Sequence, residues 1–136
     1  MGEGTKRNDL NLRMLDLASF FVGIAEEGGE NRGRIIEMFQ RVHGLPMGQS
    51  YCLDFIQYIA NETAKAHGGV AASVKTESVL HYWDNISSSH KRIFPAPGLV
   101  VCWKFDGTRG HCGIVKDASN PSHIVTIEAN TKEPGV

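Results

Sequence analysis

The sequence lacks the features that mark membrane, disulfide-rich secreted and nucleic-acid-binding proteins. No run of about 18 apolar residues occurs, so no segment is long enough to span a bilayer as a helix. Cysteine is scarce: three residues, an odd number without CxxC spacing, argue against a disulfide scaffold. Neither sign of charge is in excess, because 14 Lys and Arg stand against 15 Asp and Glu. We therefore expect no nucleic-acid partner and no insertion into a membrane.

The remaining composition is that of one globular domain. The chain has 136 residues, of which 41% are hydrophobic, and a chain of this length can bury a core without a metal or a disulfide. We interpret residues 1–136 as a single domain and expect it to be a monomer. The polar residues 1–9 are expected to be flexible and contain no apolar core of a signal peptide. The sequence accordingly predicts synthesis in the cytoplasm without a signal peptide.

Hydrophobic periodicity divides the chain into a helical part followed by a strand-rich part. Apolar residues recur at helical spacing in four segments: about 10–25, 33–43, 50–67 and 76–83. Gly28 and Gly29 are expected to end the first of these helices, and Ser50 to cap the third. Three β-rich runs follow, separated by turn residues: 99–105, 112–115 and 124–127. Helices first and strands after predict an α+β fold, with N-terminal helices packed on one face of a small antiparallel sheet.

Cys52 is the first candidate for chemistry, because it falls in the opening turn of the third predicted helix. Unpaired backbone N–H groups and the helix dipole favour negative charge there, lower the pKa of a thiol and create a thiolate nucleophile. The same N–H groups can receive the oxyanion of an attacked amide, with the side chain of Gln49 or Tyr51 as a further donor. The alternative is that Cys52 is an ordinary buried thiol that faces the core.

His111 is the candidate base, since it opens a predicted strand after Gly110 and can take a proton from a thiol. Glu128 and Asn130 end the last strand two residues apart, so both project from the same face and either can hold the second imidazole nitrogen. Taken alone, each of these residues can equally be a solvated or structural group. Their order along the chain, after a helix-start cysteine, is that of a papain-like cysteine hydrolase.

The other histidines and cysteines receive structural interpretations. Five histidines fall at helix ends, loop edges or exposed positions: His43, His67, His81, His90 and His123. A zinc site could combine the three thiols with His111, but His111 and Cys112 are neighbours on one strand and point to opposite faces. Cys102 and Cys112 are interpreted as core residues of the sheet. The sequence thus predicts no metal and no cofactor.

Five segments of the chain form a recognisable series. In chain order they are a Gly/Asn-rich segment, the segment around Cys52, a Pro-Gly turn into the sheet, a G-H-x-G-I-V strand and an I-E-x-N-T strand: 29–33, 48–56, 97–101, 110–115 and 127–131. These segments resemble those of CHAP-domain peptidoglycan hydrolases, within the wider NlpC/P60 superfamily. The resemblance implies a papain-like, NlpC/P60-type fold and covers about residues 26–135.

The resemblance also implies site roles and a reaction. It assigns the nucleophile to Cys52, the base to His111, the orienting acid to Glu128 and an accessory polar role to Asn130. The family cleaves either the amide between muramic acid and L-alanine or a peptide bond of the stem or cross-bridge. Bacterial peptidoglycan is therefore the expected partner, and the protein would act on the cell wall after release, as a phage endolysin does.

The chain departs from the family pattern at two places, and two other functions also fit the sequence. Residues 41–48 contain no carboxylate, so the calcium site of some CHAP enzymes is not expected, and Leu99 replaces the family's Asp after Pro-Gly. Tyr51, Trp83 and Trp103 are candidate walls of a substrate groove, or else core residues. The rivals are a cysteine acyltransferase or deamidase on the same fold, and a non-catalytic wall-binding or virion structural module.

Overall fold

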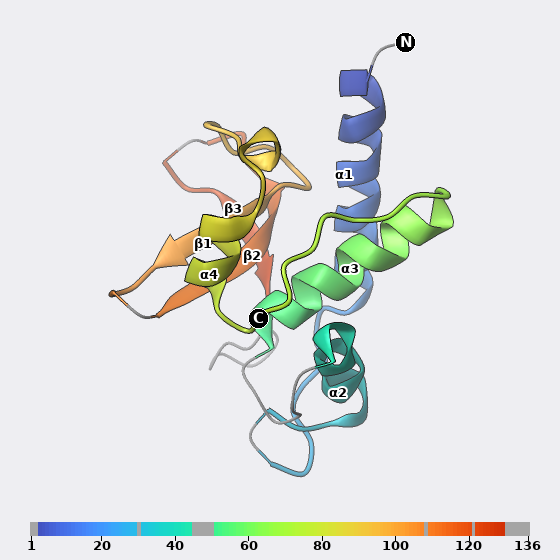
Figure 1. Cartoon of the computed structure of the whole chain (residues 1–136), viewed down its shortest axis with the longest axis vertical. Helices are drawn as coiled ribbons and strands as arrows, with labels where there is room; N and C mark the ends of the chain where they lie inside the picture. The colour runs from blue at the N-terminus through green and yellow to red at the C-terminus, as the bar shows by residue number, and fades with distance from the viewer. Residues whose placement is uncertain (1–2, 30, 45–50, 108, 121, 130–136) are drawn as a thin grey trace.

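The fold places helices before a small sheet. The computed structural model describes residues 3–29, 31–44, 51–107, 109–120 and 122–129. Within these ranges the helical elements are α1 (Glu3–Phe20), α2 (Arg34–Gln40), the 3-10 turn η1 (Arg41–His43), α3 (Cys52–Ala66), α4 (Val79–Asn85) and the 3-10 turn η2 (Ser88–His90). The strands are β1 (Val100–Lys104), β2 (Gly110–Asp117) and β3 (Val125–Glu128) (Figure 1). The predicted α+β class is confirmed.

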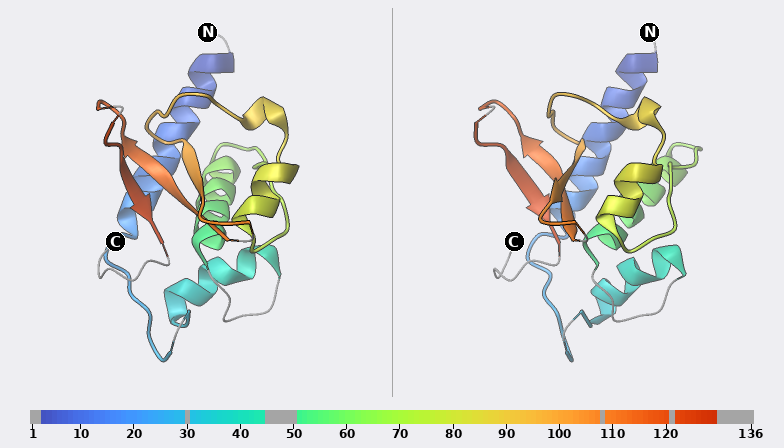
Figure 2. Two further views of the ribbon diagram at one scale, coloured as in Figure 1. Left: turned by 90° about the vertical axis from the view of Figure 1, so that its left-hand side faces the viewer. Right: turned by 60° about the vertical axis from the view of Figure 1, so that its left-hand side comes forward.

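The sheet in the described residues is antiparallel, in the order β1-β2-β3, so that β2 is central. Helices α1 and α3 pack against each other and both contact β2, whereas α4 contacts β1 and β2 (Figure 1, Figure 2). In the β2–β3 register Gly113 stands opposite Glu128. His111 lies two residues before Gly113, so all three residues share one face of the sheet. A register shift between Val115 and Asp117 separates this paired region from the loop that joins β2 to β3.

Helix α3 is central to the core because its apolar residues recur on one face. The residues of the predicted stripe are all buried: Cys52, Phe55, Ile56, Ile59 and Thr63. Phe55 meets two other rings, with centroids 5.1 Å from Phe39 and 6.4 Å from Phe21. On the sheet side, Cys112 and Ile114 of β2 are fully buried in the same core. The packing of α3 on β2 therefore sets where the start of α3 lies relative to the sheet.

Helix α1 differs from the prediction at both ends. It begins at Glu3 rather than near residue 10, because polar residues permit a helix without contributing to an apolar period. It ends at Phe20, before the predicted end at residue 25, and Gly23 then adopts φ 97°, a left-handed conformation that glycine tolerates. Among the described helices, none is both long and apolar enough to cross a membrane.

Two further details depart from the sequence analysis. Helix α3 has Tyr51 as its N-cap residue rather than Ser50, and the Tyr51 side chain makes no capping hydrogen bond. His43, interpreted as a helix-end or exposed histidine, does end a helical turn but is buried, only 6% exposed. Sequence patterns place polar side chains at the surface by default. Only the packing of η1 against α3 reveals that this one lies inside.

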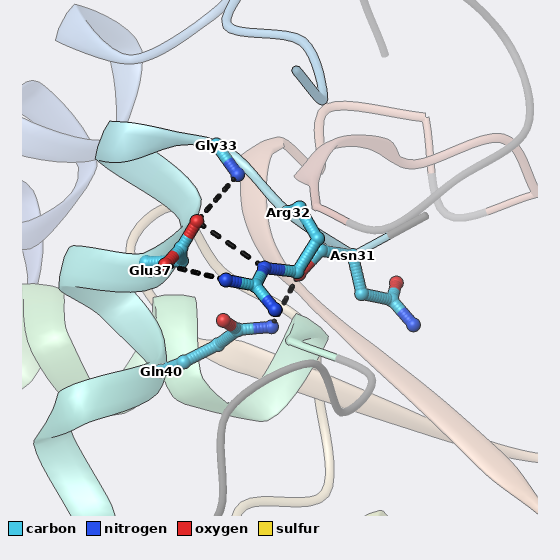
Figure 3. Close-up of polar contacts among 5 residues, drawn as sticks. All are labelled: Asn31, Arg32, Gly33, Glu37 and Gln40. Atoms are coloured by element: carbon cyan, nitrogen blue, oxygen red, sulfur yellow. Dashed lines mark hydrogen bonds and ion pairs between the residues drawn. The ribbon is translucent and has the colours of Figure 1, made fainter. Parts of the chain in front are cut away.

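A single glutamate fastens the segment before α2 to that helix. Glu37 Oε2 accepts hydrogen bonds from the Gly33 N–H at 3.0 Å and from Arg32 Nε at 3.4 Å (Figure 3). These donors, the Gly33 N–H first, lower the pKa of Glu37. Gln40 Nε2 donates to the Asn31 carbonyl at 2.8 Å. The Gly/Asn-rich segment is thus held by α2 at two successive turns.

Replacing Gly98 by alanine is expected to destabilise the fold. Gly98 has φ 87°, and a Cβ there would lie 2.2 Å from the backbone oxygen of Asn11 in α1. The Gly98 N–H also donates to the Val115 carbonyl at 2.8 Å, so the turn cannot move away without losing a bond to β2. We expect thermal unfolding of Gly98→Ala to show a Tm lower by about 5–10 °C.

The control for this prediction is Gly107→Ala. Gly107 is exposed, and a Cβ there would meet no atom within 4 Å. Its Tm should stay within about 2 °C of the unmodified protein. Equal Tm values for the two variants would contradict the close contact between α1 and the turn before β1.

Candidate active site

Cys52 is the first residue of α3. The backbone N–H groups of a first helical turn have no partner within the helix, and the Tyr51 side chain does not cap them. Together with the helix dipole, these N–H groups favour the anionic form of the thiol. The cysteine is nevertheless only 5% exposed, because the same residue packs into the core. The nucleophile candidate is therefore a buried thiol at an electropositive helix start.

His111 and Glu128 are paired between β2 and β3. Nε2 of His111 lies 2.9 Å from Oε1 of Glu128, and the two side chains are 13% and 22% exposed. Thr126, on the same face of β3, donates its hydroxyl to the other carboxylate oxygen, Oε2. Because the carboxylate accepts from Nε2–H, the neutral imidazole carries its proton there and leaves Nδ1 unprotonated. The pairing thus selects the tautomer that a base requires.

Gly113 provides the space for this pairing. A Cβ at Gly113 would lie 2.6 Å from Cγ of Glu128 and 3.0 Å from the Ile127 carbonyl oxygen. Gly113 and Glu128 are cross-strand neighbours, so the glutamate side chain runs over the bare glycine backbone. Any larger residue at this position would displace the carboxylate from His111.

The side chains of Cys112 and His111 act on the Cys52 thiol. Hydrogen bonding from Cys112 is the largest influence that lowers the pKa of Cys52, to about 5; the hydrogen bond and charge of His111 add to it, and burial opposes it. The hydrogen bond with Cys52 is in turn the main cause that raises the pKa of His111. Since Glu128 holds Nε2, Nδ1 is the ring nitrogen left to face the thiol. These opposite shifts stabilise a thiolate–imidazolium pair.

Two aromatic rings stack on His111. The Trp103 ring, opposite His111 in the β1–β2 register, lies 5.8 Å away between centroids at an interplanar angle of 16°. The centroid of the Phe105 ring lies 6.3 Å from that of His111 at an interplanar angle of 11°. Phe105 as a whole is 66% exposed. Trp103, predicted as a groove wall, therefore lies at the site. The two rings lie nearly parallel to the imidazole, whose side chain is 13% exposed.

The other predicted site residues lie elsewhere or cannot be placed. Tyr51 is buried in the core, and its hydroxyl donates to Glu26 Oε1 at 3.4 Å. Trp83, the remaining candidate groove wall, is 45% exposed on α4. Gln49 and Asn130 lie outside the described residues. The predicted catalytic residues that are described converge at one point.

Three contributors to this site were not predicted from the sequence: Thr126, Phe105 and Cys112. Thr126 stands two residues before Glu128, and Phe105 two residues after Trp103, so the strand period could have placed both on the site face. Cys112 was interpreted only as a core residue. Its contact with Cys52 has no signal in the sequence, because it depends on how α3 packs against β2.

The fold and this arrangement define a class: a small α+β protein in which a helix-start cysteine meets a histidine–carboxylate pair, the arrangement of cysteine hydrolases. The family model described as the CHAP domain matches residues 44–130, more than half of the chain, and this protein belongs to that family. The matched region contains Cys52, His111 and Glu128. CHAP domains are in general cysteine- or amidase-type enzymes that hydrolyse peptidoglycan. No curated protein and no solved structure matches the chain.

Gly113→Ala is expected to impair turnover while keeping the fold. The new Cβ must push Glu128 aside, so His111 loses the acceptor that fixes its tautomer. We expect kcat for peptidoglycan hydrolysis to fall on the order of 10- to 10³-fold. Circular dichroism checks the fold, and Gly107→Ala, whose Cβ would meet open space, should retain full turnover. An unchanged kcat in Gly113→Ala would show that Glu128 takes no part in turnover.

The shifted pKa values predict how Cys52 reacts with an alkylating agent across pH. The Cys52 pKa of about 5 means that its thiolate forms above that pH. Burial, followed by the Cys52 charge, raises the Cys102 pKa to about 11, and the pKa of Cys112 is raised well above its usual value. Mass spectrometry of iodoacetamide-treated protein between about pH 4 and pH 10 should therefore find early labelling at Cys52 alone.

The imidazole provides the check on this pH profile. His111→Ala removes a hydrogen bond and a positive charge that both lower the Cys52 pKa, so the labelling midpoint should move to higher pH. If labelling of Cys52 in the unmodified protein began only near the ordinary thiol pKa of about 8.5, Cys52 and His111 would not form a thiolate–imidazolium pair.

Proposed function

We propose that this protein is a cysteine peptidoglycan hydrolase that cleaves an amide of the stem peptide, as an N-acetylmuramoyl-L-alanine amidase or an endopeptidase. The observation that carries the proposal is the 2.9 Å contact between His111 Nε2 and Glu128 Oε1, on a histidine whose hydrogen bond and charge lower the pKa of Cys52. Each of the three residues comes from a different element, α3, β2 and β3. A nucleophile, a base and an orienting acid are thereby assembled in one place.

In the first half of the reaction, the Cys52 thiolate attacks the amide carbonyl carbon. A bond forms between Sγ and carbon, and the carbonyl oxygen becomes an oxyanion. The N–H groups of the first turn of α3, which have no partner within the helix, lie beside the thiol and are the donors that stabilise this charge. The His111 imidazolium then gives its proton to the amine, the C–N bond breaks, and a thioester remains on Cys52.

In the second half, the neutral His111 accepts a proton from water at Nδ1. The resulting hydroxide attacks the thioester, and the C–S bond breaks to release a carboxylic acid, which loses its proton to solvent. Cys52 is regenerated as a thiolate, and His111 returns to its protonated state. Glu128 keeps Nε2 protonated throughout, and the Thr126 hydroxyl holds the carboxylate in place. These steps use water, the side chains at the site and the backbone N–H groups at the start of α3.

Substrate approaches the site along its aromatic side. Phe105 stacks on His111 and is largely exposed, so it offers an apolar surface next to the base. Because peptidoglycan lies outside the cytoplasm, the proposal includes release of the protein to the cell wall, in the manner of a phage endolysin. In that setting the protein is bacteriolytic.

The test is incubation of the purified protein and Cys52→Ala with peptidoglycan sacculi, followed by mass spectrometry of the soluble products. We expect new termini with the unmodified protein and none with Cys52→Ala, because only the thiol can form the thioester. The masses of the new termini distinguish cleavage next to muramic acid from cleavage within the stem or cross-bridge.

The same experiment contains the outcomes that oppose the proposal. Release by Cys52→Ala at the normal rate would exclude thiol catalysis. If neither protein released products while both sedimented with sacculi, a non-catalytic wall-binding module would replace the enzyme. If neither protein released products or bound, a cysteine acyltransferase or deamidase acting on another acyl substrate would be favoured.

A further inference from the structure

A second cluster of polar side chains lies near the nucleophile and has no part in the proposed reaction. It comprises His43 at the end of η1, Asp54 in the first turn of α3 and Glu77 shortly before α4. Nδ1 of His43 lies 3.0 Å from Oδ1 of Asp54. One nitrogen or oxygen from each of the three residues lies within 4.8 Å of the others. Three separate segments thus bring one imidazole and two carboxylates together.

These groups are buried with few hydrogen bonds. The side chains of His43 and Asp54 are 2% and 0% exposed. In the part of the chain that the structure describes, the buried nitrogen and oxygen atoms of the three side chains have no hydrogen-bond partner outside the cluster. Buried polar atoms are normally satisfied, because an unsatisfied one loses its hydration without compensation. Their convergence therefore points to a missing ligand.

The chemistry of the three side chains indicates the charge of that ligand. Asp54 and Glu77 each contribute a carboxyl group to the cluster, and His43 contributes an imidazole nitrogen. Carboxylate oxygens attract positive charge, and the unprotonated nitrogen of a neutral imidazole binds metal ions. A cation would therefore satisfy these buried atoms.

We propose that His43, Asp54 and Glu77 form a binding site for a divalent transition-metal cation of the zinc class. Imidazole nitrogen and carboxylate oxygen are both zinc ligands, with bonds of about 2.0–2.2 Å, and three protein ligands leave a fourth position for water. Calcium does not match this set, because it takes six to eight oxygen ligands and the cluster supplies a nitrogen and two carboxylates. The inference goes beyond the proposed function, and it adds a metal that the sequence analysis did not expect.

Binding would require a small movement of one side chain. Ligand atoms in a tetrahedral zinc site lie about 3.3 Å apart, closer than the 4.8 Å that encloses the present cluster. His43 and Asp54 are already close, and Glu77 is only partly buried, so Glu77 is the side chain that closes on the metal. The bound metal would then join the end of η1, the start of α3 and the segment before α4.

The experiment measures Zn²⁺ binding to the full chain carrying Cys52→Ala, so that neither the thiolate nor catalysis takes part. We expect isothermal titration calorimetry to give one Zn²⁺ per chain and thermal unfolding to give a Tm that rises with Zn²⁺ concentration. Adding Glu77→Gln should weaken binding by at least about 10-fold and abolish most of the rise in Tm. Glu77 is partly exposed, so this variant is expected to fold, and His43→Asn provides a second removal of a ligand.

The matched control is Glu62→Gln in the same Cys52→Ala background. Glu62 is also a partly exposed glutamate, on α3, and does not belong to the cluster. It should leave the Zn²⁺ affinity and the Tm rise unchanged. Co²⁺ in place of Zn²⁺ should give absorption bands of a low-symmetry site without a thiolate-to-cobalt charge-transfer band, since Cys102 and Cys112 are not ligands.

Three results would overturn the site. One is the absence of Zn²⁺ binding to the Cys52→Ala chain, in which case the carboxyl groups share a proton instead. Another is binding that survives both Glu77→Gln and His43→Asn. The third is a thiolate-to-cobalt charge-transfer band, which would move the metal to the remaining cysteines. None of these results bears on whether Cys52 hydrolyses peptidoglycan, which the sacculus assay decides separately.

Discussion

Packing of helix α3 against the central strand β2 is the constraint on which the whole site depends. The apolar attraction between these elements is non-directional, but the close packing of a protein interior converts it into fixed distances. Cys112 and Ile114 of β2 share one core with Cys52 and its helix neighbours. The thiol therefore cannot shift relative to His111 without disturbing that core. Catalytic geometry is here a property of hydrophobic packing as much as of the polar groups themselves.

The start of α3 serves two environments at once. Cys52, which is 5% exposed, faces the sheet, where the Trp103 ring stacks on His111. Asp54, two residues later, faces η1 and contacts His43. Low hydration strengthens charge interactions in both places, which favours the thiolate–imidazolium pair on one side and makes an uncompensated carboxylate costly on the other. The first turn of α3 thus presents Cys52 to the sheet and Asp54 to η1.

The sequence allowed those features to be predicted that depend on residues close together in the chain or on the order of residues along it. The stripe on α3 and the antiparallel strands followed from periods of 3.6 and 2, and the chain order of Cys52, His111 and Glu128 indicated a cysteine hydrolase before any distance was known. What could not be predicted depends on contacts between distant segments. The burial of His43 and the meeting of Cys52 with Cys112 arise from packing, which leaves no periodic signal.

Helix ends were the other weak point, for a physical reason. Polar residues before Leu10 extend α1 without adding an apolar face, and the turn after Phe20 ends it earlier than the double glycine at 28 and 29. Hydrophobic periodicity indicates the buried side of a helix, but it does not show how far the polar ends of the helix extend. Boundaries set by backbone conformation, such as that of Gly23, must therefore be read from the structure.

The register shift between Val115 and Asp117 has a consequence for how this fold can diverge. A slip of one residue between paired strands exchanges the two faces of a sheet, and a slip at the Gly113–Glu128 pair would turn Glu128 toward the wrong side. The irregularity lies instead on the loop side of the Gly113–Glu128 pair. It absorbs an extra residue before the regular pairing begins. Changes in the hairpin between Asp117 and Val125 therefore leave the pairing of Gly113 with Glu128 unchanged. Insertions or grafted recognition loops at this hairpin would preserve the positions of the catalytic residues.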